Sequence, residues 1–231
     1  MKESRMMIIG HRGAAALEPE NTLISIERAM DIGVDAVEID VHLSKDKELV
    51  VIHDATVDRT TNGTGPVSSY TVQEIKRLDA GKGEAIPLLQ EVIDFIDRRV
   101  MLIIELKEEG TERSVVDLII RNNLFDKACV ISFWHRLVTT VKKMDSRIKT
   151  GVLLVGSPVD VCIATRASAD ALVMKYSFVD REFVEIAHKK GLRVFIWNID
   201  DQDLLKPYVD MGVDAIGTNN PGVLVEYFGK D

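Results

Sequence analysis

The chain has little cysteine, no long hydrophobic run and no excess of positive charge, and each absence excludes a class of protein. Cys129 and Cys162 are its two cysteines in 231 residues, too few for a disulfide framework or a cysteine-rich zinc site. No apolar run approaches the roughly 20 residues of a membrane-spanning helix. The amino-terminal MKESRMM has no long apolar core behind it, so we expect no signal peptide.

The net charge limits the classes of partner that the protein is expected to bind. The formal net charge is −8, which favours neither nucleic acid nor an anionic membrane surface as a partner. We therefore expect a soluble, cytoplasmic protein without stable membrane insertion. The sequence does not indicate an oligomeric state.

Strand-like and helix-like segments alternate along the chain, and 46% hydrophobic content is enough for a sizeable core. Short apolar runs predict strands at residues 7–9, 36–43, 48–53, 102–106, 130–133, 151–155, 171–174, 193–196 and 214–217. Amphipathic segments predict helices at residues 22–33, 89–97, 112–122, 135–143, 180–190 and 201–211, with a weaker one at 158–165. Asn21 is the expected N-cap of the first helix and Gly33 its stop. About eight βα units in a row predict an α/β fold, a single (β/α)8 TIM barrel domain over residues 1–231.

One segment, residues 54–86, breaks this alternation. It contains RTTNGTGPVSSYT and GKGEAIP, rich in glycine, threonine, serine and proline, around a short predicted helix at 72–78. Long connections in compact domains are usually functional. We expect a cap over the mouth of the barrel that shapes the substrate pocket; the alternative is an excursion without function.

The first candidate site residues, His11 and Arg12, stand directly after the apolar run that ends at Gly10. Ligands bind at the carboxyl ends of strands in α/β folds. A guanidinium matches phosphate oxygens two at a time, so this pair suits an anionic substrate. The alternative is that Arg12 pairs with a surface acid while His11 only ends the strand.

Carboxylates follow on two further strands. In VEIDVH, the alternation of a strand places Glu38, Asp40 and His42 on one face, and LIIELK does the same for Glu105 and Lys107. Two close carboxylates repel unless a cation lies between them, and Mg²⁺ or Ca²⁺ prefers oxygen ligands. A buried Glu–Lys ion pair is the structural alternative for the second segment. Both segments together indicate one all-oxygen metal site of Glu38, Asp40 and Glu105.

A second strand-end histidine, His53, precedes Asp54 at the end of another apolar run. With His11 it makes a pair, as hydrolysis needs one group to accept a proton and another to donate one. The remaining histidines are weaker candidates: His42 as a neighbour of the carboxylates, His135 at a helix start, and His188 on a surface.

The chain resembles the glycerophosphodiester phosphodiesterase family over essentially its whole length and in the family's order. The motifs that carry the resemblance are HRGAAALEPENT, VEIDVHLSKDKELVVIHDATVDRTTNGTG, IPLLQEVIDFI, LIIELK and GVDAIGTNNP. The resemblance implies a TIM barrel that hydrolyses glycerophosphodiesters to glycerol 3-phosphate and an alcohol with a divalent metal ion. By position, His11 and His53 match the family's acid–base histidines. Its metal ligands are matched by Glu38, Asp40 and Glu105.

Four more positions match the family's substrate contacts. Arg12 and Lys107 match its phosphate contacts. Trp197, which ends FIW, resembles the tryptophan that lines the glycerol end of the pocket. Phe133, in SFW, matches an aromatic side chain that helps to shape the same pocket.

Two short segments depart from the family's pattern. The family often has threonine, an aliphatic residue and asparagine after that tryptophan, whereas residues 198–200 read Asn-Ile-Asp. Its closing motif usually reads Thr-Asp before the proline, whereas residues 218–220 read Thr-Asn-Asn. We expect neither departure to touch the metal or the acid–base groups, and expect both to alter the pocket's polar lining and so the preferred alcohol.

Several alternatives stay open at the level of sequence. The nucleophile is water or the substrate's own glycerol hydroxyl, which would form a cyclic phosphate, and either histidine can be the acid. Mg²⁺, Ca²⁺ and Mn²⁺ all accept carboxylates. A lipid-active relative would act on lysophospholipids, for which an exposed apolar or basic loop is expected, and residues 54–86 are mostly small and polar. A barrel that binds phosphodiesters without cleaving them is the non-enzyme alternative.

Overall fold

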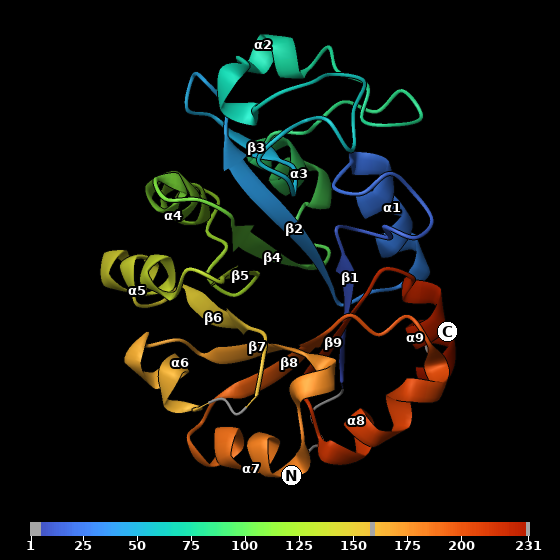
Figure 1. The fold of residues 1–231 in the computed structure, drawn as a ribbon, viewed down its shortest axis with the longest axis vertical. Coiled ribbons are helices and arrows are strands. Elements are labelled where there is room, and N and C mark those ends of the chain that lie inside the picture. Colours follow the sequence, from blue (N-terminus) through green and yellow to red (C-terminus); the bar gives the residue numbers. More distant parts are fainter. Residues whose placement is uncertain (1–5, 158–159, 230–231) are drawn as a thin grey trace.

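Eight parallel strands of the computed structural model, which describes residues 6–157 and 160–229, form a closed barrel (Figure 1). The order around the barrel is β1-β9-β8-β7-β6-β5-β4-β2, and β1 pairs with β2 to close it. The predicted TIM barrel is therefore confirmed. The strands are β1 (Met7–His11), β2 (Ala36–Leu43), β4 (Met101–Leu106), β5 (Ala128–Ser132), β6 (Lys149–Leu154), β7 (Ala171–Lys175), β8 (Arg193–Trp197) and β9 (Ala215–Thr218).

Helices surround the barrel and cover its outer face (Figure 1). They are α1 (Leu23–Ile32), α3 (Leu89–Ile96), α4 (Thr111–Arg121), α5 (His135–Met144), α6 (Cys162–Arg166), α7 (Arg181–Lys189), α8 (Leu205–Met211) and α9 (Pro221–Phe228). Helix α9, which has proline in its first turn, is not among the helices predicted from the sequence. Of the weak helix expected at 158–165, residues 158 and 159 lie outside the described part, and α6 begins at Cys162. No helix in the described ranges combines the length and apolar character needed to cross a membrane.

The start of α1 differs from the prediction. Thr22, not Asn21, is the N-cap, because its side chain accepts a hydrogen bond from the Ser25 backbone N–H. Asn21 instead has a φ of +59° and turns its side chain toward the interior, where Nδ2 donates to Asp40 at 2.9 Å. The predicted stop at Gly33 is confirmed, since this residue ends the helix in the left-handed conformation.

Along the strands, side chains alternate between the outer face of the barrel, which packs against the helices, and the barrel interior. On β2, Val37, Ile39 and Val41 pack outward with the core beneath the helices. Glu38 and Asp40 lie on the opposite face, inside the barrel, where both are buried. The barrel interior below them is apolar and contains Ile9, Ala36, Ile103, Cys129, Ile131, Leu153, Ala171, Val173, Phe195 and Ala215. The carboxylates of β2 thus lie at one end of this apolar interior.

Residues 54–86 pack beside the barrel wall. β3 (Leu49–Val51) runs antiparallel to the outer end of β2, and η1 (Val67–Ser69) and α2 (Val72–Ile75) follow. Residues of the insertion form a separate apolar cluster with two residues that precede it, Val50 and Ile52. The cluster's members from the insertion are Val57, Val67, Ile75, Ala80 and Ile86. Figure 1 shows it next to β2 and β3, outside the ring of strands. It differs from the expected cap across the mouth because its core forms on the β2–β3 hairpin, which projects from the barrel.

Candidate active site

The end of β1 places His11 and Arg12 next to β2. In the β1–β2 register His11 is opposite Glu38, and the Arg12 backbone N–H donates to Glu38 Oε2 at 3.1 Å. Arg12 itself has a φ of +51°, which is uncommon for a residue other than glycine. Such a conformation persists only where the surrounding contacts hold it in place. Gly13 follows with a φ of +84°, and an added Cβ there would lie 2.5 Å from the Ser25 backbone. The turn after β1 is thus tightly specified.

Three carboxylates meet across the β2–β4 pair. Asp40 is opposite Glu105 in the register, and Glu38 lies one strand pleat away. One carboxylate oxygen from each of the three lies within 4.8 Å of the others. Burial, then the Asp40 charge, raises the pKa of Glu105 to about 7 and that of Glu38 well above its usual value. Burial also opposes ionisation of Asp40, yet the neighbouring Lys107 and Arg12 cations outweigh it and lower its pKa.

These carboxylates fit a hard divalent cation. Glu38 Oε1 and Asp40 Oδ1 are buried without a hydrogen-bond partner, although buried polar atoms are normally satisfied. Three oxygen donors facing one point match the ligand preference of Mg²⁺, Ca²⁺ or Mn²⁺. A cation between them would relieve both the repulsion and the missing hydrogen bonds.

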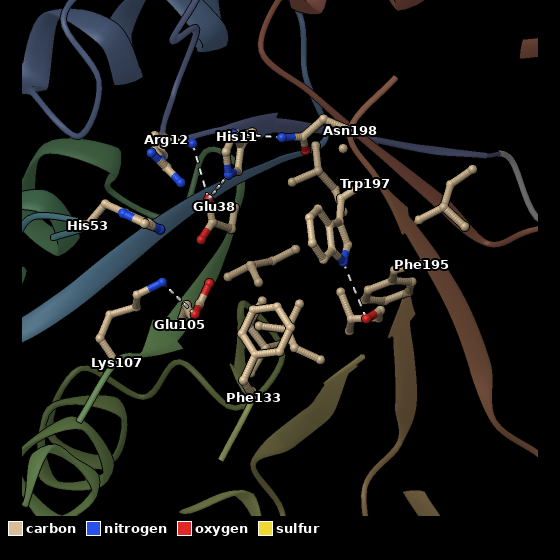
Figure 2. Close-up of a pocket in the computed structure, with 17 residues that line it drawn as sticks. His11, Arg12, Glu38, His53, Glu105, Lys107, Phe133, Phe195, Trp197 and Asn198 are labelled. Carbon is tan, nitrogen blue, oxygen red and sulfur yellow. Dashed lines mark hydrogen bonds and ion pairs between the residues drawn. The ribbon is translucent and has the colours of Figure 1, made fainter. Parts of the chain in front are cut away.

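Two cations flank this cluster. Lys107 Nζ lies 2.8 Å from Glu105 Oε1 and 3.4 Å from Asp40 Oδ1, and these charges raise its pKa despite burial. Arg12 Nε lies 3.2 Å from Asp40 Oδ2. Both side chains border the same cavity as the carboxylates, so an anion that entered there would meet two fixed positive charges (Figure 2).

His53 belongs to a chain of ion pairs that ends at Arg12. Asp54 Oδ1 lies 2.6 Å from His53 Nδ1, and Arg59 binds both Asp54 oxygens at 2.7 and 3.1 Å. Arg59 also binds both oxygens of Glu20 at 2.8 Å, and Glu20 Oε1 accepts from Arg12 Nη1 at 2.8 Å. The hydrogen bonds from Arg59 lower the pKa of Asp54. Through Arg59 the insertion is linked to the segment of His53 and to the segment of Arg12.

His11 is held from the opposite side by two amides. Asn219 Oδ1 lies 2.7 Å and Asn198 Nδ2 3.0 Å from His11 Nδ1. Burial, then the Arg12 charge, lowers the pKa of His11. Both departures, at 198–200 and 218–220, thus contact one of the two predicted acid–base histidines, contrary to the expectation from the sequence. The barrel brings β1, β8 and β9 together, so residues about 200 positions apart meet at one imidazole.

The cavity at this end of the barrel has a volume of about 150 Å³ and two unlike halves (Figure 2). The polar half contains the histidines, carboxylates and cations. The other half is apolar and is lined by Ile103, Ile131, Leu153, Val173, Phe195, Phe133 and Trp197. Phe133 and Trp197 meet edge to face with ring centroids 6.0 Å apart, and the Trp197 indole N–H donates to the Val173 carbonyl at 3.4 Å. A ligand here would place a charged group on one side and carbon atoms on the other.

The structure brings all nine site residues predicted from the sequence to this cavity. Eight of them line it: His11, Arg12, Glu38, His53, Glu105, Lys107, Phe133 and Trp197. Asp40 lies fully buried directly behind Glu105 and Arg12. The weaker histidines lie elsewhere. His42 contacts the His53 carbonyl, His135 the Leu153 carbonyl, and the exposed His188 pairs with Asp214.

Sequence reasoning missed several polar partners. Glu20 and Asn21 lie in the PENT part, and Arg59 in the DRTT part, of the motifs quoted above. Their charged or amide side chains among small residues are the signal that could have identified them. Asn198 and Asn219 were noticed only as departures. Asn219 meets His11 because β9 lies beside β1 in the closed barrel, and Asn198 follows β8, the next strand around.

Comparisons with known proteins agree with this geometry. The family model "Glycerophosphoryl diester phosphodiesterase family" matches residues 11–223. A glycerophosphodiester phosphodiesterase from Caldanaerobacter subterraneus is 38% identical over 240 residues, which cover 98% of this chain and 99% of that one. One from Bacillus altitudinis is 34% identical, over 93% of this chain and 94% of the relative.

Solved structures are similar over the same extent. A phosphodiesterase from Oleispira antarctica, in complex with the product sn-glycerol-3-phosphate, matches with a TM-score of 0.88 and 29% identity over 97% of each chain. A glycerophosphodiester phosphodiesterase from Agrobacterium tumefaciens matches with a TM-score of 0.86 and 27% identity, over 96% of this chain and all of the other. The chain belongs to the glycerophosphoryl diester phosphodiesterase family.

Proposed function

We propose that this family member hydrolyses glycerophosphodiesters to sn-glycerol 3-phosphate and an alcohol in the cavity at the end of β1, β2 and β4. One observation carries the proposal: three carboxylates, two cations and two histidines surround a cavity whose other half is apolar. A glycerophosphodiester has the matching parts, an anionic phosphate and a short carbon skeleton. The bound product in the Oleispira antarctica phosphodiesterase supports this substrate class.

A divalent metal ion completes the proposed site. Glu38, Asp40 and Glu105 would hold it, because they offer hard oxygen donors and two buried oxygens without hydrogen-bond partners. Such an ion supplies a Lewis acid that offsets charge on the phosphate. Mg²⁺, Ca²⁺ and Mn²⁺ are the candidates.

The protein's own side chains have separate roles in the proposal. Arg12 and Lys107 bind phosphate oxygens, and their charges offset the charge that grows in the transition state. His11 and His53 transfer protons: one accepts a proton from the nucleophile and the other donates one to the leaving alcohol. The nucleophile is water or the substrate's glycerol hydroxyl. Phe133 and Trp197 pack against the glycerol carbons.

Lysophospholipids are a second substrate class, favoured by apolar side chains on the rim of the barrel. Phe133, Trp134, Val155 and Phe178 are between 36% and 56% exposed. They follow β5, β6 and β7, three neighbouring strands, and Phe133 also borders the cavity. The exposed apolar rim sought in residues 54–86 thus lies on other loops. An acyl chain on these side chains would continue the apolar half of the cavity.

A substrate and metal panel tests the proposal. The purified protein is incubated with glycerophosphocholine, glycerophosphoethanolamine or lysophosphatidylcholine, each with EDTA, Mg²⁺, Ca²⁺ or Mn²⁺, and glycerol 3-phosphate, choline and ethanolamine are measured. Metal-dependent glycerol 3-phosphate from the deacylated diesters is the expected result. No product from any substrate, with the protein folded, would favour a phosphodiester-binding protein instead.

One variant separates the two substrate classes. Trp134→Ala should slow choline release from lysophosphatidylcholine but not glycerophosphocholine hydrolysis, because Trp134 is outside the cavity lining. Ile120→Ala is the control, an exposed apolar residue on α4. Equal effects of both variants, or no choline from the lysolipid, would reject the lysolipid class.

A further inference from the structure

His11 Nδ1 lies between two amides that make opposite demands on it. Asn219 presents its carbonyl oxygen at 2.7 Å, which calls for a proton on Nδ1. Asn198 presents its NH₂ group at 3.0 Å, which calls for a lone pair there. One imidazole nitrogen cannot satisfy both, so a third group has to decide the tautomer.

Asp200 fixes the Asn219 amide. Its Oδ2 accepts from Asn219 Nδ2 at 2.7 Å, and its Oδ1 accepts from the Asn219 backbone N–H at 2.6 Å and the Thr218 hydroxyl at 2.8 Å. An ionised carboxylate only accepts, and hydrogen bonds to it are about twice as strong as neutral ones. The Asn219 NH₂ group therefore faces Asp200, and its oxygen has to face His11.

Asn198 has no comparable anchor. Its Oδ1 is buried without a hydrogen-bond partner. A rotation of this amide about its Cβ–Cγ bond would bring that oxygen to the Nδ1 proton. The orientation with the NH₂ group toward His11 therefore gains little stabilisation. The anchored amide therefore outweighs the unanchored one.

We propose that Asp200 and Asn219 are positioning residues that hold the proton of neutral His11 on Nδ1. Nε2, which lies 3.8 Å from Glu38 Oε2, is then the nitrogen with the free lone pair on the carboxylate side of the cavity. The inference rests on the proposed function, in which His11 is one of the two proton-transfer groups. Its tautomer then decides which nitrogen can take part.

The two departures from the family's pattern contribute one residue each to a single pair. Asp200 and Asn219 form one acid–amide pair, in which the amide contacts His11 and the acid lies behind it. Exchanging the two side-chain types would retain one acceptor for Nδ1–H and one hydrogen bond between the pair. The arrangement in this chain keeps the negative charge one side chain away from His11. Exchanging both residues together should therefore be tolerated better than changing either alone.

Ring ¹⁵N NMR of the full-length protein at pH 8 tests the tautomer directly. Each His11 nitrogen is assigned with the help of His11→Ala. The expected spectrum shows a protonated Nδ1 in the wild type and in Asp201→Asn, which removes a neighbouring carboxylate that caps η3 (Gln202–Leu204) instead. Asp200→Asn should shift the spectrum toward protonated Nε2. A wild-type spectrum with the proton on Nε2 would overturn the proposal.

Kinetics provide the second readout. Asp200→Asn and Asn219→Asp should each lower kcat about 10- to 100-fold with little change in KM, because the orientation of a reactive group is lost while binding contacts remain. The double variant Asp200→Asn/Asn219→Asp should recover to within a few-fold of the wild type. A double variant no better than Asn219→Asp, or Asp200→Asn equal to Asp201→Asn, would contradict the inference.

The two readouts separate this inference from the proposed function. Should the wild type cleave no glycerophosphodiester, the proposed function fails, while the NMR tautomer still decides the role of Asp200. Should Asp200→Asn not fold, as judged by circular dichroism, the comparison of Asn219→Asp with the double variant remains.

Discussion

Both histidines of the cavity have Nδ1 engaged by a polar side chain. For His53 the partner is the Asp54 carboxylate at 2.6 Å, and for His11 it is the Asn219 amide oxygen at 2.7 Å. The two partners differ in charge, because a carboxylate is an anion and an amide oxygen is neutral. Each partner holds its imidazole in one orientation, which a proton-transfer group requires.

Removing either imidazole should lower turnover while the fold survives. We expect His11→Ala and His53→Ala each to reduce kcat by roughly 10²- to 10⁴-fold, the usual contribution of general acid–base catalysis. Initial rates of glycerol 3-phosphate release measure the effect, and circular dichroism checks the fold. His188→Ala is the matched control, since His188 is exposed on α7 and pairs with Asp214. Near wild-type rates in either cavity variant would refute the assignment.

At the scale of elements, the insertion is connected to the site through one side chain, Arg59. Arg59 binds Asp54 and Glu20, and these carboxylates contact His53 and Arg12 in turn. None of residues 55–86 lines the cavity. We infer that the insertion influences substrate through this chain of ion pairs, without covering the mouth.

Breaking that attachment should weaken catalysis without exposing the cavity. In Arg59→Ala, Asp54 and Glu20 lose a shared bidentate partner, so His53 and Arg12 are held less firmly; we expect kcat/KM to fall at least about 10-fold. Steady-state kinetics on glycerophosphocholine measure it. Arg77→Ala, an exposed arginine of the same insertion, is the control. An unchanged kcat/KM in Arg59→Ala would show that the insertion has no functional connection to the site.

For the whole molecule, the sequence predicted the barrel and the core of the site for a definite physical reason. Period-2 alternation on β2 separates Val37, Ile39 and Val41 from Glu38 and Asp40, and this follows from strand geometry alone. Parallel strands place their carboxyl ends at one edge, so residues such as His11 and Glu105 had to converge.

Other features depended on contacts that a local pattern does not contain. His11 meets Asn219 across 208 positions, and Arg59 meets Glu20 across 39. The mistaken N-cap at Asn21 has the same origin, because its side chain bonds to Asp40 instead of the helix. The place of the insertion was set by its own apolar cluster, whose residues are scattered between Val50 and Ile86.

Metal binding should weaken as the pH falls. Because the pKa of Glu105 is raised to about 7 in the metal-free protein, a metal ion has to displace a proton from it below that pH. We expect the apparent Kd for Mg²⁺ or Mn²⁺ to rise by at least about 10-fold per pH unit between pH 7 and pH 5.5, since the pKa of Glu38 is raised as well. Isothermal titration calorimetry in two buffers measures both the Kd and the proton release. A Kd independent of pH would contradict the raised pKa of Glu105.

The same carboxyl should make the metal-free protein less stable at high pH. Its pKa rises from 4.5 in the unfolded chain to about 7 in the fold, so between these values the folded state keeps a proton that the unfolded state has lost. The contribution of Glu105 to stability is therefore full below pH 4.5 and is lost as the pH rises through 7, by at most about 3 kcal/mol.

Glu105→Gln removes that loss, since glutamine does not titrate. In EDTA at pH 8 the variant should resist urea better than the wild type, and at pH 4.5 the difference should shrink. Saturating metal should reverse the order, because the wild type gains about 2.7 kcal/mol at a metal concentration of 100 Kd and the variant has lost a ligand. Glu109→Gln, which removes an exposed carboxylate paired with Arg136, should change stability by less than about 0.5 kcal/mol. A metal-free Glu105→Gln that unfolds more easily than the wild type at pH 8 would mean that Lys107 stabilises the Glu105 carboxylate more than burial and Asp40 destabilise it.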